Sequence, residues 1–158
     1  MAEIINLSLE SLTPTIQEKN ITVEKRLENS FVFCDPVHLR EVIVNIFNNA
    51  IDAMNNGGRL AVELSTKSRY TKIIIKDSGI GIAKENLPYI LNPFFTTKNL
   101  NYNYGLGLSY CYKVLQKHGG TLEISSIEKQ GTVVTLTIPN RKRRPWILQK
   151  SKAKSASV

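Results

Sequence analysis

The chain has 158 residues, of which 42% are hydrophobic and 22% charged, a balance typical of one globular domain. This composition excludes a wholly disordered chain, and no apolar run reaches the ~18 residues that a membrane-spanning helix needs. The net charge of +8 arises mainly in residues 141–158, which hold seven Lys or Arg and no acidic residue. Because the other 140 residues have a net charge of +1, the basic character does not indicate a nucleic-acid-binding fold.

The first half of the chain shows a helix, two short strands and a second helix. Apolar residues at helical spacing predict a helix over 4–19, and alternation predicts strands within 21–33, the second at Phe31-Val32-Phe33. Asp35-Pro36 is a favourable helix start, because Asp caps free backbone N–H groups and Pro suits the first turn. We expect this helix to run to about Met54 and to end at the glycines 57 and 58.

The second half predicts four strands and one more helix. We expect strands over 59–66 and 70–76, little regular structure over 77–104, a helix from just after Gly105 to His118, and strands over 121–126 and 131–138. Since strands and helices do not alternate strictly, the pattern favours an α+β layered sandwich. We divide the chain into a linker segment (1–20), one domain (21–139) and a basic tail (140–158). We expect the tail to be a flexible extension, or else an electrostatic contact with an acidic partner, lipid headgroups or nucleic acid.

The two cysteines, Cys34 and Cys111, are 77 positions apart and form no metal-ligand spacing with His38 or His118. We expect two reduced, buried thiols. The first residues lack the basic-then-apolar layout of a secretory signal, which favours the cytoplasm.

Four polar or glycine-rich clusters occur in a fixed order. Asn45 and Asn49 are four positions apart and share one face of the predicted helix. Taken alone, each of the four clusters, this one and the three named below, is also compatible with a plain structural role. Such a role would be a polar helix face, an ordinary turn or a loop with an aromatic anchor. No Walker A sequence is present, which excludes a P-loop protein. The other three clusters are Asp77-Ser78-Gly79-Ile80-Gly81, Pro93-Phe94-Phe95-Thr96-Thr97-Lys98 and Gly105-Leu106-Gly107-Leu108.

In this order the clusters resemble the ATP-binding catalytic domain of a sensor histidine kinase, within the gyrase, heat-shock-chaperone, histidine-kinase and mismatch-repair ATPase group. They match its N box, first glycine box, F box and second glycine box, and Gly131-Thr132 resembles the closing one. The resemblance covers residues 31–139, and the Thr-Thr-Lys form is similar to nitrogen-regulatory and sporulation-type kinases. It implies a two-layer α/β sandwich (a Bergerat-type fold), with a mixed, mostly antiparallel sheet covered by about three helices.

The resemblance also implies a site for ATP and Mg²⁺. Asn49 would ligate the metal ion, since an amide oxygen suits this hard cation without adding an anion. Asp77 would accept a hydrogen bond from the adenine amino group, which guanine lacks at that position. Asn45 and Lys98 would act in catalysis. The implied ATP-contacting residues are Asn45, Asn49, Asp77, Gly79, Gly81, Ile82, Phe94, Thr97, Lys98, Gly105, Leu106, Gly107, Leu108 and Thr132.

Two features of this chain differ from the pattern of relatives. ATP-hydrolysing relatives carry Glu where Asn45 stands, so we expect weak hydrolysis. Many members have Lys and an aromatic residue where Asp52 and Ala53 stand, so Lys98 would replace that phosphate contact. Neither His38 nor His118 lies in a phosphoacceptor motif. We therefore expect a protein-histidine kinase domain that cannot autophosphorylate alone.

The implied partners are a phosphoacceptor hairpin domain of the same kinase and a response regulator, with no specific nucleic acid. The isolated chain would be a monomer and the full-length kinase a cytoplasmic homodimer, unless a missing sensor region anchors it in a membrane. Two other readings stay open: a stand-alone anti-sigma serine kinase, whose family usually carries the Glu that Asn45 replaces, and a non-enzymatic binding module.

Overall fold

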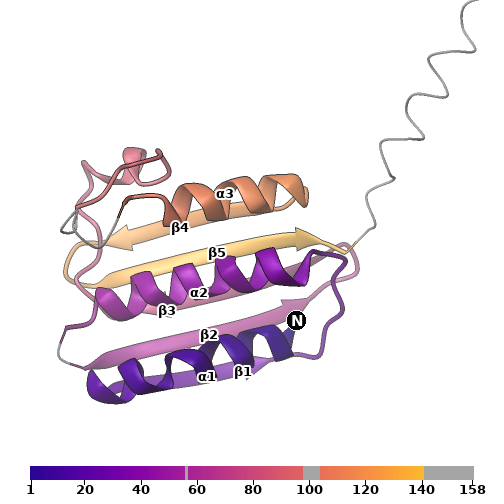
Figure 1. Ribbon diagram of the computed structural model, residues 1–158, viewed down its shortest axis with the longest axis horizontal. Coiled ribbons are helices and arrows are strands. Elements are labelled where there is room, and N and C mark those ends of the chain that lie inside the picture. Colours follow the sequence, from indigo (N-terminus) through magenta and orange to yellow (C-terminus); the bar gives the residue numbers. More distant parts are fainter. Residues whose placement is uncertain (56, 98–103, 141–158) are drawn as a thin grey trace, which may run out of the picture.

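The computed structural model describes residues 1–55, 57–97 and 104–140. In that part, a five-stranded sheet in the order β1-β2-β3-β5-β4 has α1, α2 and α3 on one face (Figure 1). The β1–β2 pair is parallel, and the other three pairs are antiparallel. The expected two-layer sandwich with a mixed, mostly antiparallel sheet and three helices is therefore confirmed. In the same described part, no helix combines the length and the apolar character needed to cross a bilayer.

The bounds of the elements follow the sequence pattern closely. Asp35 caps α2 as predicted, its Oδ1 accepting hydrogen bonds from the backbone N–H groups of Val37 and His38. In chain order the elements are α1 (Ala2–Glu18), β1 (Ile21–Leu27), α2 (Pro36–Asp52), β2 (Gly58–Thr66), β3 (Tyr70–Asp77), a short 3-10 helix (Leu87–Tyr89), α3 (Gly107–Lys117), β4 (Thr121–Ile127) and β5 (Gly131–Pro139).

The predicted strand at Phe31-Val32-Phe33 is wrong. Residues 28–35 connect β1 to α2, residues 31–33 belong to no strand, and the Phe31 side chain is 96% exposed. Just before this apolar run, the carbonyl of Ser30 accepts a hydrogen bond from the Met1 amino group and ties the connection to the start of the chain. A local pattern cannot reveal such a long-range contact.

One hydrophobic core joins the helical layer to the sheet. α1 contacts β1, α2 contacts β3 and α3 contacts β4, while neighbouring helices contact one another. The segment expected to be a linker contributes α1, and its Ile5, Leu9 and Ile16 side chains are buried in the same cluster as Phe47 of α2. Because alternate strand residues point to opposite faces, the other face carries exposed charges such as Glu63 of β2.

Candidate functional site

Asp77, the last residue of β3, is a buried carboxylate at the edge of the helical layer. It is 4% exposed, and its Oδ1 accepts hydrogen bonds from the backbone N–H groups of Gly79 (2.9 Å) and Thr132 (3.2 Å). Burial raises the pKa of the Asp77 carboxyl, and the backbone N–H groups of Gly79, Thr132 and Asp77 itself oppose that shift. The hydrogen bonds from Gly79 and Thr132 both end on Oδ1, so Oδ2 can accept a hydrogen bond from a ligand.

Thr132 of β5 is paired with Asp77 on the neighbouring strand β3, and it belongs to a second polar group. Ser126 Oγ of β4 donates to the carbonyl of Gly131 (2.9 Å) and accepts from the backbone N–H of Ile82 (2.8 Å). Thr132 Oγ1 lies 2.9 Å from Ser126 Oγ. Since the one hydroxyl hydrogen of Ser126 is used, Thr132 donates to it and keeps its own lone pairs as acceptors beside Asp77.

Sequence reasoning did not find Ser126. In the printed sequence it is one of two adjacent serines in a strand, and such a pair is common at the edge of a sheet. The signal that could have found it is the register of β4 with β5, in which Ser126 stands opposite Thr132. That register becomes visible only once the strands are paired.

The glycines after Asp77 are required by packing within the protein. A Cβ on Gly79 would lie 2.6 Å from the carbonyl oxygen of Ala53, at the end of α2, and one on Gly81 would lie 2.1 Å from the carbonyl oxygen of Ile127. Gly81 also has a φ of +66°, which side chains disfavour. The segment after β3 is thereby held against α2 on one side and β4 on the other.

Asn45 and Asn49 lie one turn apart on α2, and both side chains are half-buried. A Cβ on Gly107, the first residue of α3, would lie 3.5 Å from Asn45 Oδ1, so the start of α3 rests beside this amide. Asn49 lies one turn before Ala53, whose backbone N–H donates to the Asn49 carbonyl. Along α2, Asn49 therefore lies between Asn45, beside the start of α3, and Ala53, against which Gly79 packs.

The segment around Phe94 is tied to the start of α3. The backbone N–H of Phe94 donates to the carbonyl of Gly105 (3.0 Å). Gly105 has a φ of +67°, and a Cβ at this position would lie 2.5 Å from the carbonyl carbon of Phe94, so a side chain there is excluded. The Phe94 side chain is 73% exposed and does not anchor the loop. Instead, Phe95 stacks near Tyr89, with ring centroids 6.0 Å apart.

The described motifs thus converge around the carboxyl-terminal half of α2. Asp77, Gly79 and Thr132 form one group, and Asn45 and Gly107 form another, with Asn49 between them along α2. Ile82 and Leu108 are half-buried, and Leu106 and Thr97 are exposed. Lys98 and most of the predicted basic tail lie outside the described residues.

The donor set fits a magnesium ion held jointly with a phosphate ligand. Among the described residues no three His, Cys, Asp or Glu side chains come together, so a cage made of protein carboxylates is not available there. Mg²⁺ usually keeps only one or two protein ligands and takes the rest from phosphate and water. The half-buried amides of Asn45 and Asn49 provide neutral oxygens of this kind.

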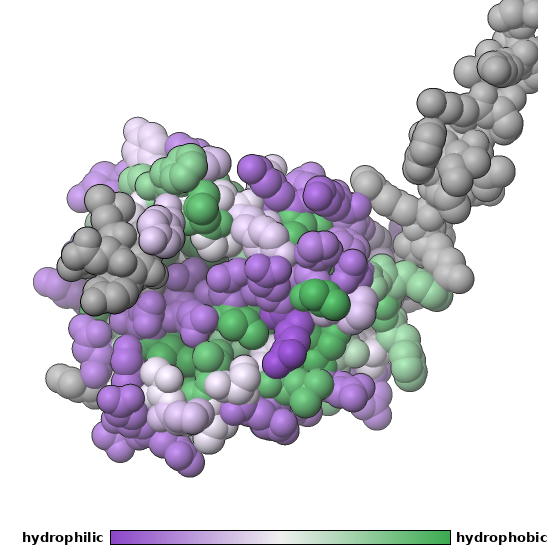
Figure 2. Space-filling view, in the orientation of Figure 1, coloured by the Kyte–Doolittle hydropathy of each residue, from purple (hydrophilic) through white to green (hydrophobic). Residues whose placement is uncertain are grey.

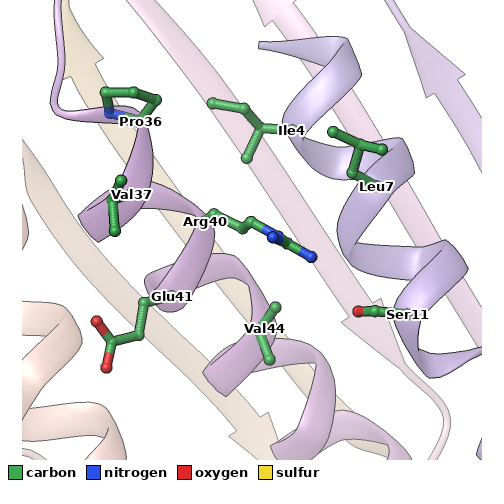
Figure 3. Close-up of a pocket in the computed structure, with 8 residues that line it drawn as sticks. All are labelled: Ile4, Leu7, Ser11, Pro36, Val37, Arg40, Glu41 and Val44. Carbon is green, nitrogen blue, oxygen red and sulfur yellow. The ribbon is translucent and has the colours of Figure 1, made fainter.

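An open groove of about 610 Å³ lies on the other side of α2, between α1 and α2 (Figure 3). Ile4 and Leu7 project from α1 toward α2, and Arg40 extends across from α2. Figure 2 shows apolar residues gathered over this part of the helical face. None of the predicted site residues lines the groove, which is bordered by Ile4, Leu7, Ser11, Pro36, Val37, Arg40, Glu41 and Val44.

Comparison with known proteins places this geometry in a family. Residues 34–142 match the family described as histidine kinase-, DNA gyrase B-, and HSP90-like ATPase. Sporulation kinase E of Bacillus subtilis is 37% identical over 111 residues, which are 70% of this chain and 15% of the relative. The sensor histidine kinase ZraS of Escherichia coli is 33% identical over 138 residues, 86% of this chain and 29% of the relative. The chain therefore spans less than a third of the length of these relatives.

Solved structures resemble the whole described domain. The catalytic domain of the histidine kinase ThkA superposes with a TM-score of 0.79 at 29% identity, covering 88% of this chain and 93% of that one. The mycobacterial sensor histidine kinase MprB superposes with a TM-score of 0.78 at 27% identity, covering 90% of this chain and 96% of that one. The likeness extends beyond the matched motifs to the complete sandwich.

Proposed function

Because this chain belongs to the histidine kinase-, DNA gyrase B- and HSP90-like ATPase family, we propose that it is the catalytic domain of a two-component sensor histidine kinase. In this proposal it binds Mg-ATP and donates the γ-phosphoryl group to a histidine on a separate hairpin domain. The observation that carries the proposal is the buried carboxylate of Asp77, with Oδ1 held by two backbone N–H groups and Oδ2 left for a ligand.

Asp77 would give the site its preference for adenine. Its Oδ2 would accept a hydrogen bond from the exocyclic amino group, and guanine would instead place a carbonyl oxygen against it. The lone pairs of Thr132 Oγ1, left by its hydrogen bond to Ser126, would accept from the same edge or from a bridging water. We therefore expect ATP to bind much more tightly than GTP.

The two amides on α2 would serve the triphosphate. Asn49 would hold Mg²⁺ and Asn45 would contribute from the same helical face, while Lys98, outside the described residues, would neutralise phosphate charge. The bound metal ion would neutralise the charge of the phosphate oxygens. Gly105, Leu106, Gly107 and Leu108 would bring the helix start, with its free backbone N–H groups, close to the same phosphates.

The site is suited to transfer rather than hydrolysis. Asn45 offers no basic lone pair to activate water, and the nearest carboxylate on that face, Glu41, accepts a hydrogen bond from Tyr110. In the transfer, an unprotonated imidazole nitrogen forms a bond to the γ-phosphorus as the bond to the β,γ-bridging oxygen breaks and ADP leaves. We propose that the chain alone does not carry out this reaction, because neither His38 nor His118 is its acceptor.

The partners follow from the same proposal. They are the phosphoacceptor hairpin of the same kinase and a downstream response regulator. One solved neighbour is the histidine kinase ThkA in complex with response regulator protein TrrA. We propose that the isolated chain is a monomer, that the whole kinase is a homodimer, and that this domain works in the cytoplasm.

Two measurements test the proposal. Calorimetric titration with ATP and GTP, each with and without Mg²⁺, should show Mg²⁺-dependent ATP binding that is lost in Asp77→Asn and kept in Glu63→Gln, a carboxylate on the far face of the sheet. A supplied hairpin domain should then acquire acid-labile phosphohistidine. Absence of ATP binding overturns the kinase proposal, and acid-stable phosphoserine on a protein substrate supports the anti-sigma serine kinase instead.

A further inference from the structure

α2 and α3 lie side by side and run in opposite directions (Figure 1). Near the start of α3, Gly107 rests beside Asn45. One turn further along α3, Cys111 Sγ approaches the carbonyl of Val42 at 3.7 Å. The two helices therefore meet along their length, and the contact at Asn45 is the one that enters the candidate site.

A polar link joins the helices one turn away from that contact. The Tyr110 hydroxyl of α3 donates a hydrogen bond to Glu41 Oε2 of α2, and His38 Nδ1 lies 2.9 Å from the same hydroxyl oxygen. Because a carboxylate only accepts, the Tyr110 hydroxyl uses its hydrogen in the bond to Glu41. His38 Nδ1 therefore donates to the tyrosine oxygen. Partial burial and the Glu41 carboxylate raise the pKa of Tyr110 to about 12, so the hydroxyl remains a donor at neutral pH.

The spacing of these residues places the link in register with the site. Glu41 is four positions before Asn45, so both lie on one face of α2, and Tyr110 is three positions after Gly107 on α3. No described side chain caps the first turn of α3. Among the described residues, the Tyr110 hydroxyl joins this turn to α2 through its hydrogen bonds with Glu41 and His38.

We propose that Tyr110 and Glu41 are a positioning pair that holds the first turn of α3 beside Asn45, and thereby sets the fit of the site to the triphosphate. This inference rests on the proposed function, which it deepens by assigning residues outside the recognised motifs. The pair lies on the phosphate side of the site, away from Asp77 and Thr132. Its loss should therefore weaken binding of the phosphates while leaving recognition of adenine intact.

A merely structural role would give a different result. If the link only added stability, its removal would lower the melting temperature and change binding of every adenine ligand by the same factor. In a positioning role, removal of the link weakens binding of ATP but not of adenosine, because only ligands with a triphosphate use the start of α3. The comparison of ATP with adenosine therefore decides between the two roles.

The test uses Tyr110→Phe, which keeps the ring and removes the hydroxyl. The matched control is Tyr112→Phe, an exposed tyrosine on the same helix. With Mg²⁺ present, we expect Tyr110→Phe to weaken ATP binding about fivefold, the scale of one lost hydrogen bond, with adenosine binding unchanged. Glu41→Ala should match it, whereas Glu41→Gln, which keeps an acceptor oxygen, should restore ATP binding to within about twofold of the wild type.

Hydrogen exchange without nucleotide gives a second measurement. The backbone N–H of Tyr110, which donates to the Leu106 carbonyl, should exchange faster in Tyr110→Phe and not in Tyr112→Phe. Equal ATP affinity of the two variants, or equal losses for ATP and adenosine, would overturn the positioning pair. If the wild type binds no ATP, the proposed function itself fails, and the exchange result still shows whether the link holds the helix start.

Discussion

The imidazole of His118, just after the end of α3, accepts a hydrogen bond at Nε2 from the backbone N–H of Asp35 (3.0 Å), the residue that caps α2. Its Nδ1 lies 2.8 Å from the carbonyl of Val114. Because a carbonyl only accepts, the hydrogen is on Nδ1 and the ring is the neutral tautomer. His118 thus connects the end of one helix to the beginning of its neighbour.

Removal of this connection should cost stability without affecting nucleotide binding. We expect His118→Ala to lower the free energy of unfolding by about 1–2 kcal/mol, since it leaves the Asp35 N–H and the Val114 carbonyl without this partner. Denaturant unfolding measures the change, and Lys113→Ala on the exposed face of α3 is the control. Equal unfolding midpoints for the two variants would contradict the prediction.

The raised pKa of Asp77 predicts a specific pH dependence of stability. Below the unfolded-state pKa of about 4 the carboxyl is neutral in both states and burial carries no charge penalty. As the pH rises, the unfolded chain ionises first, so stability falls until the pH exceeds the folded-state pKa. Asp77→Asn, which does not titrate, should therefore gain stability relative to the wild type as the pH rises from about 4 to 7.

This trend can be checked by urea unfolding of both proteins at several pH values. Glu63→Gln, which removes an exposed carboxylate from β2, controls for the general loss of charge. A constant difference between the wild type and Asp77→Asn across this range would show that Asp77 is equally easy to ionise in both states.

The two cysteines should differ in reactivity. Cys111 is fully buried, and desolvation raises the pKa of its thiol to about 12. Cys34 is half-buried, and desolvation also raises its pKa. Since the thiolate is the reactive form, a thiol reagent should modify Cys34 slowly in the folded protein and Cys111 only after unfolding. The measurement is the number of thiols labelled with and without denaturant.

A variant lacking Cys34 identifies which thiol reacts. In Cys34→Ser we expect no labelling of the folded protein and one labelled thiol in denaturant. Rapid labelling of this variant without denaturant would mean that the contact between α3 and α2 opens readily.

The Gly81→Ala change should be severely destabilising. A Cβ at this position would lie 2.1 Å from the Ile127 carbonyl oxygen, and the φ of +66° is itself unfavourable for alanine. We expect a loss of about 2–4 kcal/mol in the free energy of unfolding. Thermal unfolding measures it, with Ala83→Gly nearby in the same segment as a control for altered chain flexibility. An unchanged melting temperature would show that this segment shifts freely.

The sequence predicted the elements whose signals are local. The Asp35-Pro36 start of α2, the glycines before β2 and the alternation of β2, β3, β4 and β5 all lie within a few residues of the observed bounds. The strand predicted at Phe31-Val32-Phe33 was wrong, and the Phe31 and Phe33 side chains are exposed to solvent while Val32 packs against the core. Which apolar residues are buried depends on how α1 and the chain start fold back, and no local pattern carries that information.

In the candidate site, too, residues with a local sequence signal were predicted and residues that depend on distant contacts were not. Asn45, Asn49, Asp77 and the glycines stand out in the sequence, because their types and spacing are unusual for a helix or a turn. Ser126 and the Tyr110–Glu41 link do not, since they gain their partners only from strand register and helix packing. Residues that bind a ligand directly were therefore easier to predict than those that hold them in place.

The region matched by the family begins at residue 34, but the hydrophobic core begins earlier. β1 pairs with β2 along its whole length, and α1 places Ile5, Leu9 and Ile16 in the shared core. A shortened chain beginning at Cys34 would leave one side of β2 without its neighbouring strand and much of α2 without its cover. We therefore expect a chain shortened in this way to be unstable, because the hydrophobic core includes residues that precede the matched region.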